Sequence, residues 1–198
     1  MYKISHFLLN HLPFLWCIVE YVNEKLFFLR YGNRMKKIHA CLEKYQEKYQ
    51  IKEATLKDVQ PMVAFFAKQP EESYTYFQPH EFDDKSIKRI VNNRAFLGFL
   101  VYDGKDLIGY YFLRCFFIGK CFLGKIVDFE HQGKGIGKMM CLSAMDVATS
   151  LQMRMFETIS KENISSLYST QKVLDTKLVK EMDNNYIYIE DFPKGTLK

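Results

Sequence analysis

The chain has 198 residues, of which 48% are hydrophobic and 26% are charged. This length and composition indicate one globular domain with an extension, and they exclude a largely disordered chain. The net charge of +5 is small, and the longest basic run is only Lys36 and Lys37. That charge argues against a nucleic-acid-binding protein but suits a small anionic ligand or an anionic membrane surface.

The cysteines and histidines are scattered along the chain. The five cysteines, an odd number, form no C-x-x-C pair, which favours reduced thiols and a cytoplasmic location. The five histidines do not combine with cysteines or carboxylates at the spacing of metal ligands. We therefore predict no metal site.

Residues 1–50 are expected to form a helical extension ahead of a domain at 51–198. The apolar run at 7–19 is 13 residues long, too short for a transmembrane helix, which needs about 20. No small-residue cleavage site follows it, so it is not a secretory signal. Residues 7–37 combine apolar and basic side chains, which fits peripheral contact with the inner face of a membrane. Alternatively, they form a helical hairpin packed on the main domain or on a second subunit of a homodimer.

The next elements are a strand at 51–54 and a helix that starts at Thr55. Thr55 and Asp58 have the spacing of a capping box, whereas Pro61 conflicts with a helix at its second turn. Residues 71–82 are loop-like and aromatic, and a second helix starts at Asp83 and Asp84.

Apolar runs at 96–102, 107–117 and 121–129 are separated by turns at Gly104 and Gly119, and they predict an antiparallel meander. A helix at 135–150, a strand at 154–159 and a helix at 163–174 follow. Strands at 177–182 and 186–190 form a final hairpin around Asp183, Asn184 and Asn185.

The stretch H-Q-G-K-G-I-G-K at 131–138 places a glycine-rich bend between a strand and a helix. The first N–H groups of a helix lack intrahelical partners, and such an end binds phosphate. The P-loop pattern and the G-x-G-x-x-G dinucleotide pattern both fail here. The pattern Q-x-x-G-x-G fits, with Gln132, Gly135 and Gly137.

Residues 127–137, V-D-F-E-H-Q-G-K-G-I-G, resemble the acyl-CoA signature V-x-P-x-x-Q-G-x-G-I-G of the GNAT superfamily of N-acyltransferases. Only the proline is missing, and Phe129 replaces it. Residues 51–58 resemble the opening strand and helix of that family, and Asn163 with Ser166 resembles its later helix start. The resemblance implies an α/β (α+β) fold with a mixed, mostly antiparallel central sheet flanked by helices.

The resemblance also implies an acetyl-CoA-dependent N-acetyltransferase in which the bend at 132–138 holds the diphosphate of the co-substrate. The N–H of Val127 is expected to stabilise the oxyanion of the tetrahedral intermediate. The implied cofactor-binding residues are Val127, Phe129, Gln132, Gly133, Lys134, Gly135, Ile136, Gly137, Lys138 and Asn163.

The general base is not settled by the sequence. Asp128 and Glu130 are expected on one face of the motif strand, and Glu157 on the following strand is a third candidate; each is alternatively a solvated surface carboxylate. His131 is interpreted as a turn residue. Where relatives place a tyrosine as general acid this chain has Thr170, so Tyr168 is a nearby candidate, and protonation of the thiolate by water is the alternative.

The acceptor site in this family is built by the first two helices and the loop between them, here 73–82. Tyr74, Tyr76 and Phe77 suit stacking on a sugar or ring, or alternatively they pack against the edge of the sheet. The acceptor is expected to be a small-molecule amine, with an amino sugar of surface polysaccharide synthesis favoured. A peptide amine and a polyamine stay open. The alternative to an enzyme is a CoA-binding adaptor that acts through its N-terminal segment.

Overall fold

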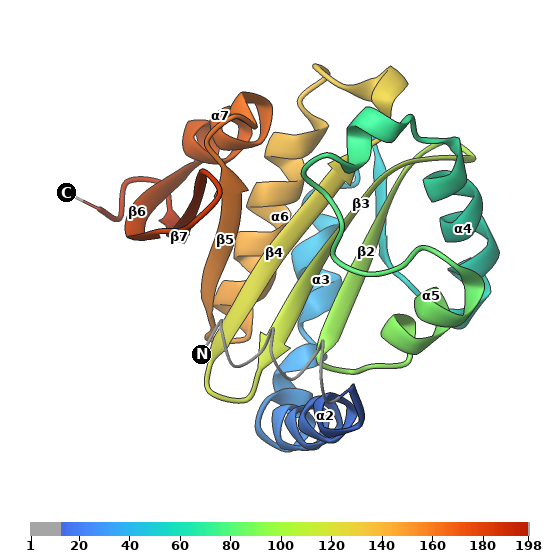
Figure 1. Ribbon diagram of the computed structural model, residues 1–198, viewed down its shortest axis with the longest axis vertical. Helices are drawn as coiled ribbons and strands as arrows, with labels where there is room; N and C mark the ends of the chain where they lie inside the picture. Colours follow the sequence, from blue (N-terminus) through green and yellow to red (C-terminus); the bar gives the residue numbers. More distant parts are fainter. Residues whose placement is uncertain (1–12, 198) are drawn as a thin grey trace.

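The computed structural model describes residues 13–197, with side chains from Trp16 onward. One seven-stranded sheet runs through it in the order β1-β2-β3-β4-β5-β7-β6. Neighbouring strands are antiparallel, except β4 and β5, which are parallel. The strands are β1 (Gln50–Glu53), β2 (Phe96–Asp103), β3 (Asp106–Phe116), β4 (Lys120–Val127), β5 (Arg154–Ser160), β6 (Leu174–Glu181) and β7 (Tyr186–Pro193). The predicted mixed, mostly antiparallel sheet is confirmed (Figure 1).

Helices cover both faces of this sheet. The α-helices are α2 (Pro13–Met35), α3 (Ile38–Glu43), α4 (Val59–Lys68), α5 (Asp84–Val91), α6 (Ile136–Ser150) and α7 (Ile164–Val173), and the short 3₁₀ helices are η1 (Leu56–Asp58), η2 (Glu71–Tyr74) and η3 (Phe129–His131). Tyr111 and Leu113 of β3 pack in one core with α3 and α6, whereas Tyr110 and Phe112 pack in a second core with α4 and α5. Neighbouring residues of a strand point to opposite faces, so the two cores lie on the two sides of the sheet.

The first helices are attached to this domain through buried aromatic and aliphatic side chains. Phe27, Tyr31, Ile38 and Leu42 are buried in the core that α6 also lines. This packing matches the alternative in which the segment lies on the main domain, but Figure 1 shows α2 nearly end-on and α3 running along the sheet, so the two helices cross and do not form a hairpin. Helix α3 ends at Glu43, and turns lead from it into β1. Residues 7–12 of the predicted membrane segment lie outside the described residues, and none of the helices at 13–197 is long and apolar enough to cross a bilayer.

The capping box predicted at Thr55 is present, but it starts the 3₁₀ helix η1 rather than an α-helix. The α-helix begins at Val59, so Pro61 lies in its first turn. N–H groups of the first turn have no intrahelical acceptor, and proline therefore costs this helix no hydrogen bond. The expected conflict at Pro61 was wrong for that reason.

Two strand boundaries also differ from the sequence prediction. Strand β4 ends at Val127 rather than at residue 129, and η3 follows. The last hairpin is longer than predicted, because β6 begins directly after α7 and pairs Leu174 with Pro193.

Candidate active site

A groove opens where β4 and β5 separate. These parallel strands pair only at 120–122 and 154–156, and beyond that point they diverge around a groove of about 420 Å³. Residues 123–127 of β4 and 157–160 of β5 line its two sides. The bend before α6, the start of α7 and the segment around η2 complete the lining. The groove therefore runs from the interrupted sheet to the N-terminus of α6.

Backbone donors of β4 are directed into this groove. The N–H of Asp128 donates to the carbonyl oxygen of Ile108 on β3 at 2.9 Å. Since N–H directions alternate along a strand, the N–H groups of Lys125 and Val127 point away from β3. The edge of β4 can thus bind an extended ligand as an additional strand would bind.

The glycine bend provides a second set of donors. Gly133 and Gly135 adopt φ angles of +76° and +84°, which residues with a side chain rarely adopt. Within the described part of the chain, the N–H groups of residues 132–137 donate to no protein acceptor, whereas that of Lys138 donates to the carbonyl oxygen of Gly135 at 3.1 Å. Six N–H groups without a protein acceptor at the start of a 15-residue helix have the donors and the helix dipole that suit an anion.

Most of the predicted cofactor-binding residues line the groove. They are Val127, Gln132, Gly133, Gly135, Ile136, Gly137, Lys138 and Asn163. Phe129 and Lys134 do not line it, and the N–H of Phe129 is already bonded to Gln69 Oε1 at 3.1 Å. The Lys138 ammonium lies 4.9 Å from the ring centre of Tyr168, so Tyr168 sits beside the first turn of α6.

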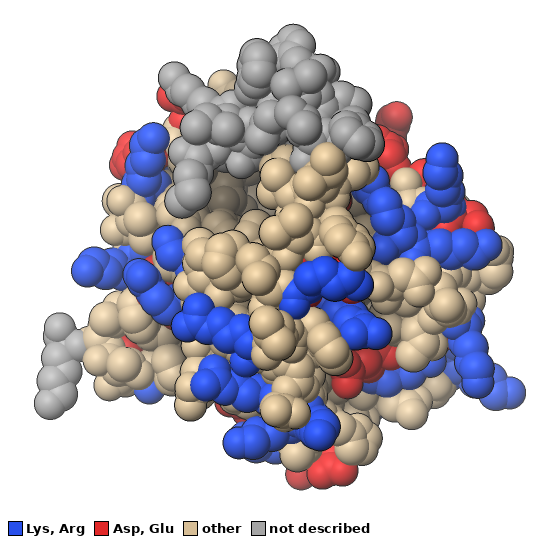
Figure 2. All heavy atoms as spheres, turned by 90° about the horizontal axis from the view of Figure 1, so that it is seen from below, with Lys and Arg blue, Asp and Glu red and all other residues tan. Residues whose placement is uncertain are grey.

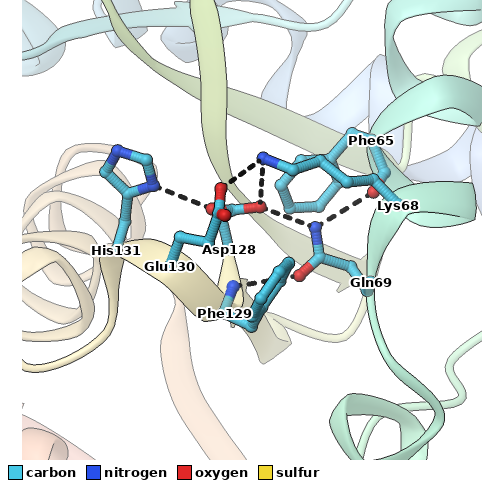
Figure 3. Close-up of polar contacts among 7 residues, drawn as sticks. All are labelled: Phe65, Lys68, Gln69, Asp128, Phe129, Glu130 and His131. Atoms are coloured by element: carbon cyan, nitrogen blue, oxygen red, sulfur yellow. Dashed lines mark hydrogen bonds and ion pairs between the residues drawn. The ribbon is translucent and has the colours of Figure 1, made fainter.

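The prediction that Asp128 and Glu130 share one strand face was wrong, because both follow the end of β4. Asp128 is fully buried and Glu130 is exposed. Asp128 Oδ1 accepts from Gln69 Nε2 at 2.9 Å and lies 3.3 Å from Lys68 Nζ (Figure 3). Burial raises the pKa of Asp128, but the hydrogen bonds from Gln69 and His131 and the charge of Lys68 outweigh it and hold that pKa below its usual value. Asp128 therefore joins the end of α4 to η3 as a carboxylate.

His131 is the group through which this network reaches the groove. Its Nδ1 lies 2.8 Å from Asp128 Oδ2, and the residue lines the groove. Figure 3 shows the other ring nitrogen pointing away from Asp128. A histidine oriented by a buried carboxylate can accept a proton at its free nitrogen. The sequence interpretation of His131 as only a turn residue missed this pairing.

A buried ion pair crosses the floor of the groove. Lys125 Nζ on β4 lies 2.7 Å from Glu157 Oε2 on β5 and donates to Thr170 Oγ1 on α7 at 3.0 Å. The Thr170 hydroxyl in turn donates to Glu157 Oε1 at 2.9 Å. Burial lowers the pKa of Lys125, but the attraction of Cys141 and Glu157 outweighs it and raises that pKa above the usual lysine value. Glu157, predicted as a possible base, is thus a buried partner of a lysine.

Two further titratable groups pack against this pair. Asp191 of β7 is 4% exposed, and within the described residues neither of its carboxylate oxygens has a hydrogen-bond partner. Burial and the neighbouring Glu157 raise the pKa of Asp191 to about 9. Burial raises the pKa of the Cys141 thiol to about 11. At neutral pH both groups are therefore uncharged.

The segment around η2 forms the other end of the groove. Glu72, Ser73, Tyr76 and Phe77 line it. Tyr74 takes the packing alternative: it lies against the core beside α4 and donates to the carbonyl oxygen of Phe66. Among residues 13–197, no group of three or more His, Cys, Asp and Glu side chains is arranged to hold a metal ion.

Lys125 and Lys68 were not singled out from the sequence. Lys125 is a charged residue in the interior of β4, and Glu157 is one in the interior of β5; the other charged residues of these strands, Lys120 and Arg154, stand at their starts. Opposite charges inside two buried strands indicate that the two side chains form an ion pair, since buried charges are almost always paired. No local pattern links Lys68 and Gln69 to Asp128, which lies about 60 residues further along.

No protein-family model matches the sequence, and no curated protein matches it. Solved structures match it by fold. The GNAT domain of PAT from S. lividans is 16% identical and has a TM-score of 0.63, with 73% of this chain and 90% of that domain covered. The ribosomal-protein-S5-alanine acetyltransferase from Vibrio fischeri is 14% identical with a TM-score of 0.61, over 77% of this chain and 96% of that one.

A third similar structure is the PaiA N-acetyltransferase from Thermoplasma acidophilum in complex with coenzyme A. It is 13% identical with a TM-score of 0.59, over 72% of this chain and 97% of that one. Identities this low establish the fold and not the activity. The chain therefore has the fold of the GNAT acetyltransferases, as the glycine motif predicted.

Proposed function

We propose that the protein transfers an acetyl group from acetyl-CoA to a primary amine. The observation that carries this proposal is the groove between β4 and β5, which ends at six unpaired N–H groups of the bend at 132–137. Such donors suit the diphosphate of CoA. Its pantetheine arm carries two amide units, which suit the edge of β4. The complex of a similar structure with coenzyme A supports this placement.

The thioester would lie beside the N–H groups of Val127 and Lys125. When the amine nitrogen attacks the carbonyl carbon, the N–C bond forms and the oxygen gains negative charge, which one of these N–H groups stabilises. Collapse of the intermediate breaks the C–S bond and leaves the electron pair on sulfur. Alignment of both reactants in one groove contributes much of the acceleration.

We propose that His131 removes the proton from the attacking amine, directly or through one water. Of the predicted bases, Asp128 acts only by orienting His131, and Glu130 does not line the groove. A general base of this kind contributes about 10²- to 10⁴-fold in rate.

For the acceptor we propose an amino sugar of surface polysaccharide synthesis. Tyr76 is 40% exposed, so its ring is available to stack on a sugar. Glu72 and Ser73 line the same end of the groove and can bind an ammonium group or hydroxyls.

Release of free thiol from acetyl-CoA tests the function. The panel contains free and nucleotide-linked amino sugars, a peptide amine and spermidine. We expect release with an amino sugar. If thiol is released only with the peptide or only with spermidine, that amine and not an amino sugar is the acceptor. If CoA binds but no amine causes release, the protein is the CoA-binding adaptor.

We further propose that the outer side of α2 contacts an anionic membrane surface. Ile18, Val22, Leu26 and Leu29 are exposed along one side of this helix, and Leu29 is 84% exposed. The same segment carries Lys25, Arg30, Arg34, Lys36 and Lys37. Figure 2, which looks onto the side of the molecule where α2 lies, shows Lys and Arg gathered there and fewer acidic residues. Apolar side chains beside basic ones suit the headgroup region of anionic lipids.

Co-sedimentation of the full chain with vesicles tests this contact. We expect binding to vesicles of phosphatidylcholine with phosphatidylglycerol, and no binding to phosphatidylcholine alone. Leu29→Glu should weaken binding, whereas Leu178→Glu on β6, which is also exposed at 53%, should not. If the protein forms a dimer and does not bind vesicles, the exposed side of α2 contacts a second copy of the chain. A position at the inner face of the membrane remains a prediction that this assay tests.

A further inference from the structure

We propose that the buried ammonium of Lys125 receives the sulfur of CoA and stabilises the thiolate that leaves when the C–S bond breaks. This inference rests on the proposed acetyl transfer and assigns the group that assists its leaving step. It is carried by the position of Lys125, by the way its ammonium is held and by its charge.

Lys125 lines the β4 side of the groove. Its N–H is one of the two β4 donors that face the gap, so the residue adjoins the thioester in any pose that uses these donors. Its side chain reaches Glu157 across the point where β4 and β5 have separated. A sulfur atom lying in that gap would therefore rest against the ion pair on the groove floor.

The Lys125 ammonium is held in place by two hydrogen bonds, which leave its third N–H donor without a partner among the described residues. An ammonium has three N–H donors, and in the described part of the chain two of them are directed to Glu157 and Thr170. The side chain is 7% exposed, and the residue lines the groove. The proposal directs the third N–H to the sulfur of the bound ligand.

Lys125 acts as a fixed positive charge and not as a proton donor. Its pKa lies above the usual lysine value, so it stays protonated beside a thiolate, which is the weaker base. Asp191 is neutral at pH 7 because its pKa is raised to about 9, which leaves Glu157 as the one anion paired with Lys125. The departing thiolate takes its proton from solvent after release.

The other groove residues suited to this role lie closer to the bend. Lys138 belongs to the first turn of α6, and Tyr168 lies beside it. Both therefore adjoin the proposed diphosphate end, and Lys125 is the cation at the thioester end.

The pKa of the thiol in bound CoA tests this assignment without an acceptor. Ultraviolet absorbance reports the thiolate, and the complex with desulfo-CoA is the reference. The titration runs from about pH 6 to 10, and the desulfo-CoA complex subtracts the absorbance of protein thiols such as Cys141, whose pKa is raised to about 11. In the wild-type protein we expect a pKa about one unit below that of free CoA, which is about a tenfold gain in thiolate.

Lys125→Met with Glu157→Gln should return that pKa to the value of free CoA. Changing both partners avoids a buried unpaired charge. The control is Lys44→Met with Asp146→Asn, which removes the 2.9 Å ion pair between residue 44 and α6 outside the groove and should leave the shift intact. Thr170→Val, which removes one of the two hydrogen bonds of the ammonium, should reduce the shift.

Two results would overturn the assignment. One is wild-type protein that binds CoA with an unshifted thiol, and the other is a shift that persists in the Lys125 and Glu157 double variant. Failure of both CoA and desulfo-CoA to bind would instead refute the proposed function, and this inference with it.

Discussion

Substitution of Gly135 by alanine tests the glycine bend most sharply. Gly135 lies at the N-cap of α6 with φ of +84°, and a Cβ atom added there would meet no heavy atom within 4 Å. Alanine at this position would therefore not clash with any other part of the protein. The cost arises from the left-handed backbone, which is about 1–2 kcal/mol less favourable for a residue with a side chain.

Part of that strain is relieved by a change in the backbone, and the change moves the neighbouring N–H groups. A loss of binding free energy equal to the strain weakens CoA binding about tenfold, since 1.4 kcal/mol corresponds to a factor of ten. The Tm should fall by about 2–4 °C for each kcal/mol, as is usual for a chain of this length.

Gly195→Ala is the matched control. Gly195 has φ of +82° and equally open space for a Cβ atom, but it lies beyond β7 and does not line the groove. Both variants should lose similar stability, measured by thermal unfolding, and only Gly135→Ala should weaken CoA in isothermal titration calorimetry. Equal affinity of both variants for CoA would refute the assignment of the bend.

Three further predictions concern titratable groups. His131→Gln should lower kcat/KM by about 10²-fold or more, whereas His39→Gln, at an exposed position of α3, should not; an unchanged kcat/KM in His131→Gln would exclude His131 as the base. Asp191→Asn should raise the Tm more at pH 9 than at pH 5. The pKa of Asp191 is raised in the folded protein, so the contribution of this carboxyl to stability is lost as the pH rises toward about 9. A Tm difference independent of pH would contradict this. Asp128→Asn should cost about 1–3 kcal/mol in the free energy of unfolding at pH 7. Because the pKa of Asp128 is lowered, that difference should shrink as the pH falls below its usual value, and thermal unfolding at acid pH checks it.

The parts of the fold that local chemistry determines were predicted from the sequence. Asp83 caps α5 by accepting from the Ser86 N–H, and Asn163 caps α7 by accepting from the Ser166 N–H. Both are short-range contacts that a sequence pattern records. The glycine bend is equally local, since strand, turn and helix follow one another within a few residues.

The parts of the site that depend on distant residues were not predicted. The end of β4 at Val127 depends on Gln69, whose side chain accepts from the N–H of Phe129 and donates to Asp128. An apolar residue such as Phe129 continues the strand pattern, so the sequence alone favoured a longer strand. The Lys125 and Glu157 pair likewise requires the parallel arrangement of β4 and β5, which no local spacing records.

Amide NMR of residues 132–137 tests the central claim, that these six N–H groups hold the diphosphate of CoA. Spectra of the full chain are compared with CoA and with pantetheine, which lacks the diphosphate. We predict that CoA shifts the 132–137 amide proton signals downfield, as new hydrogen bonds do, and that pantetheine leaves them unchanged. Saturating CoA that leaves these six signals in place would contradict the account.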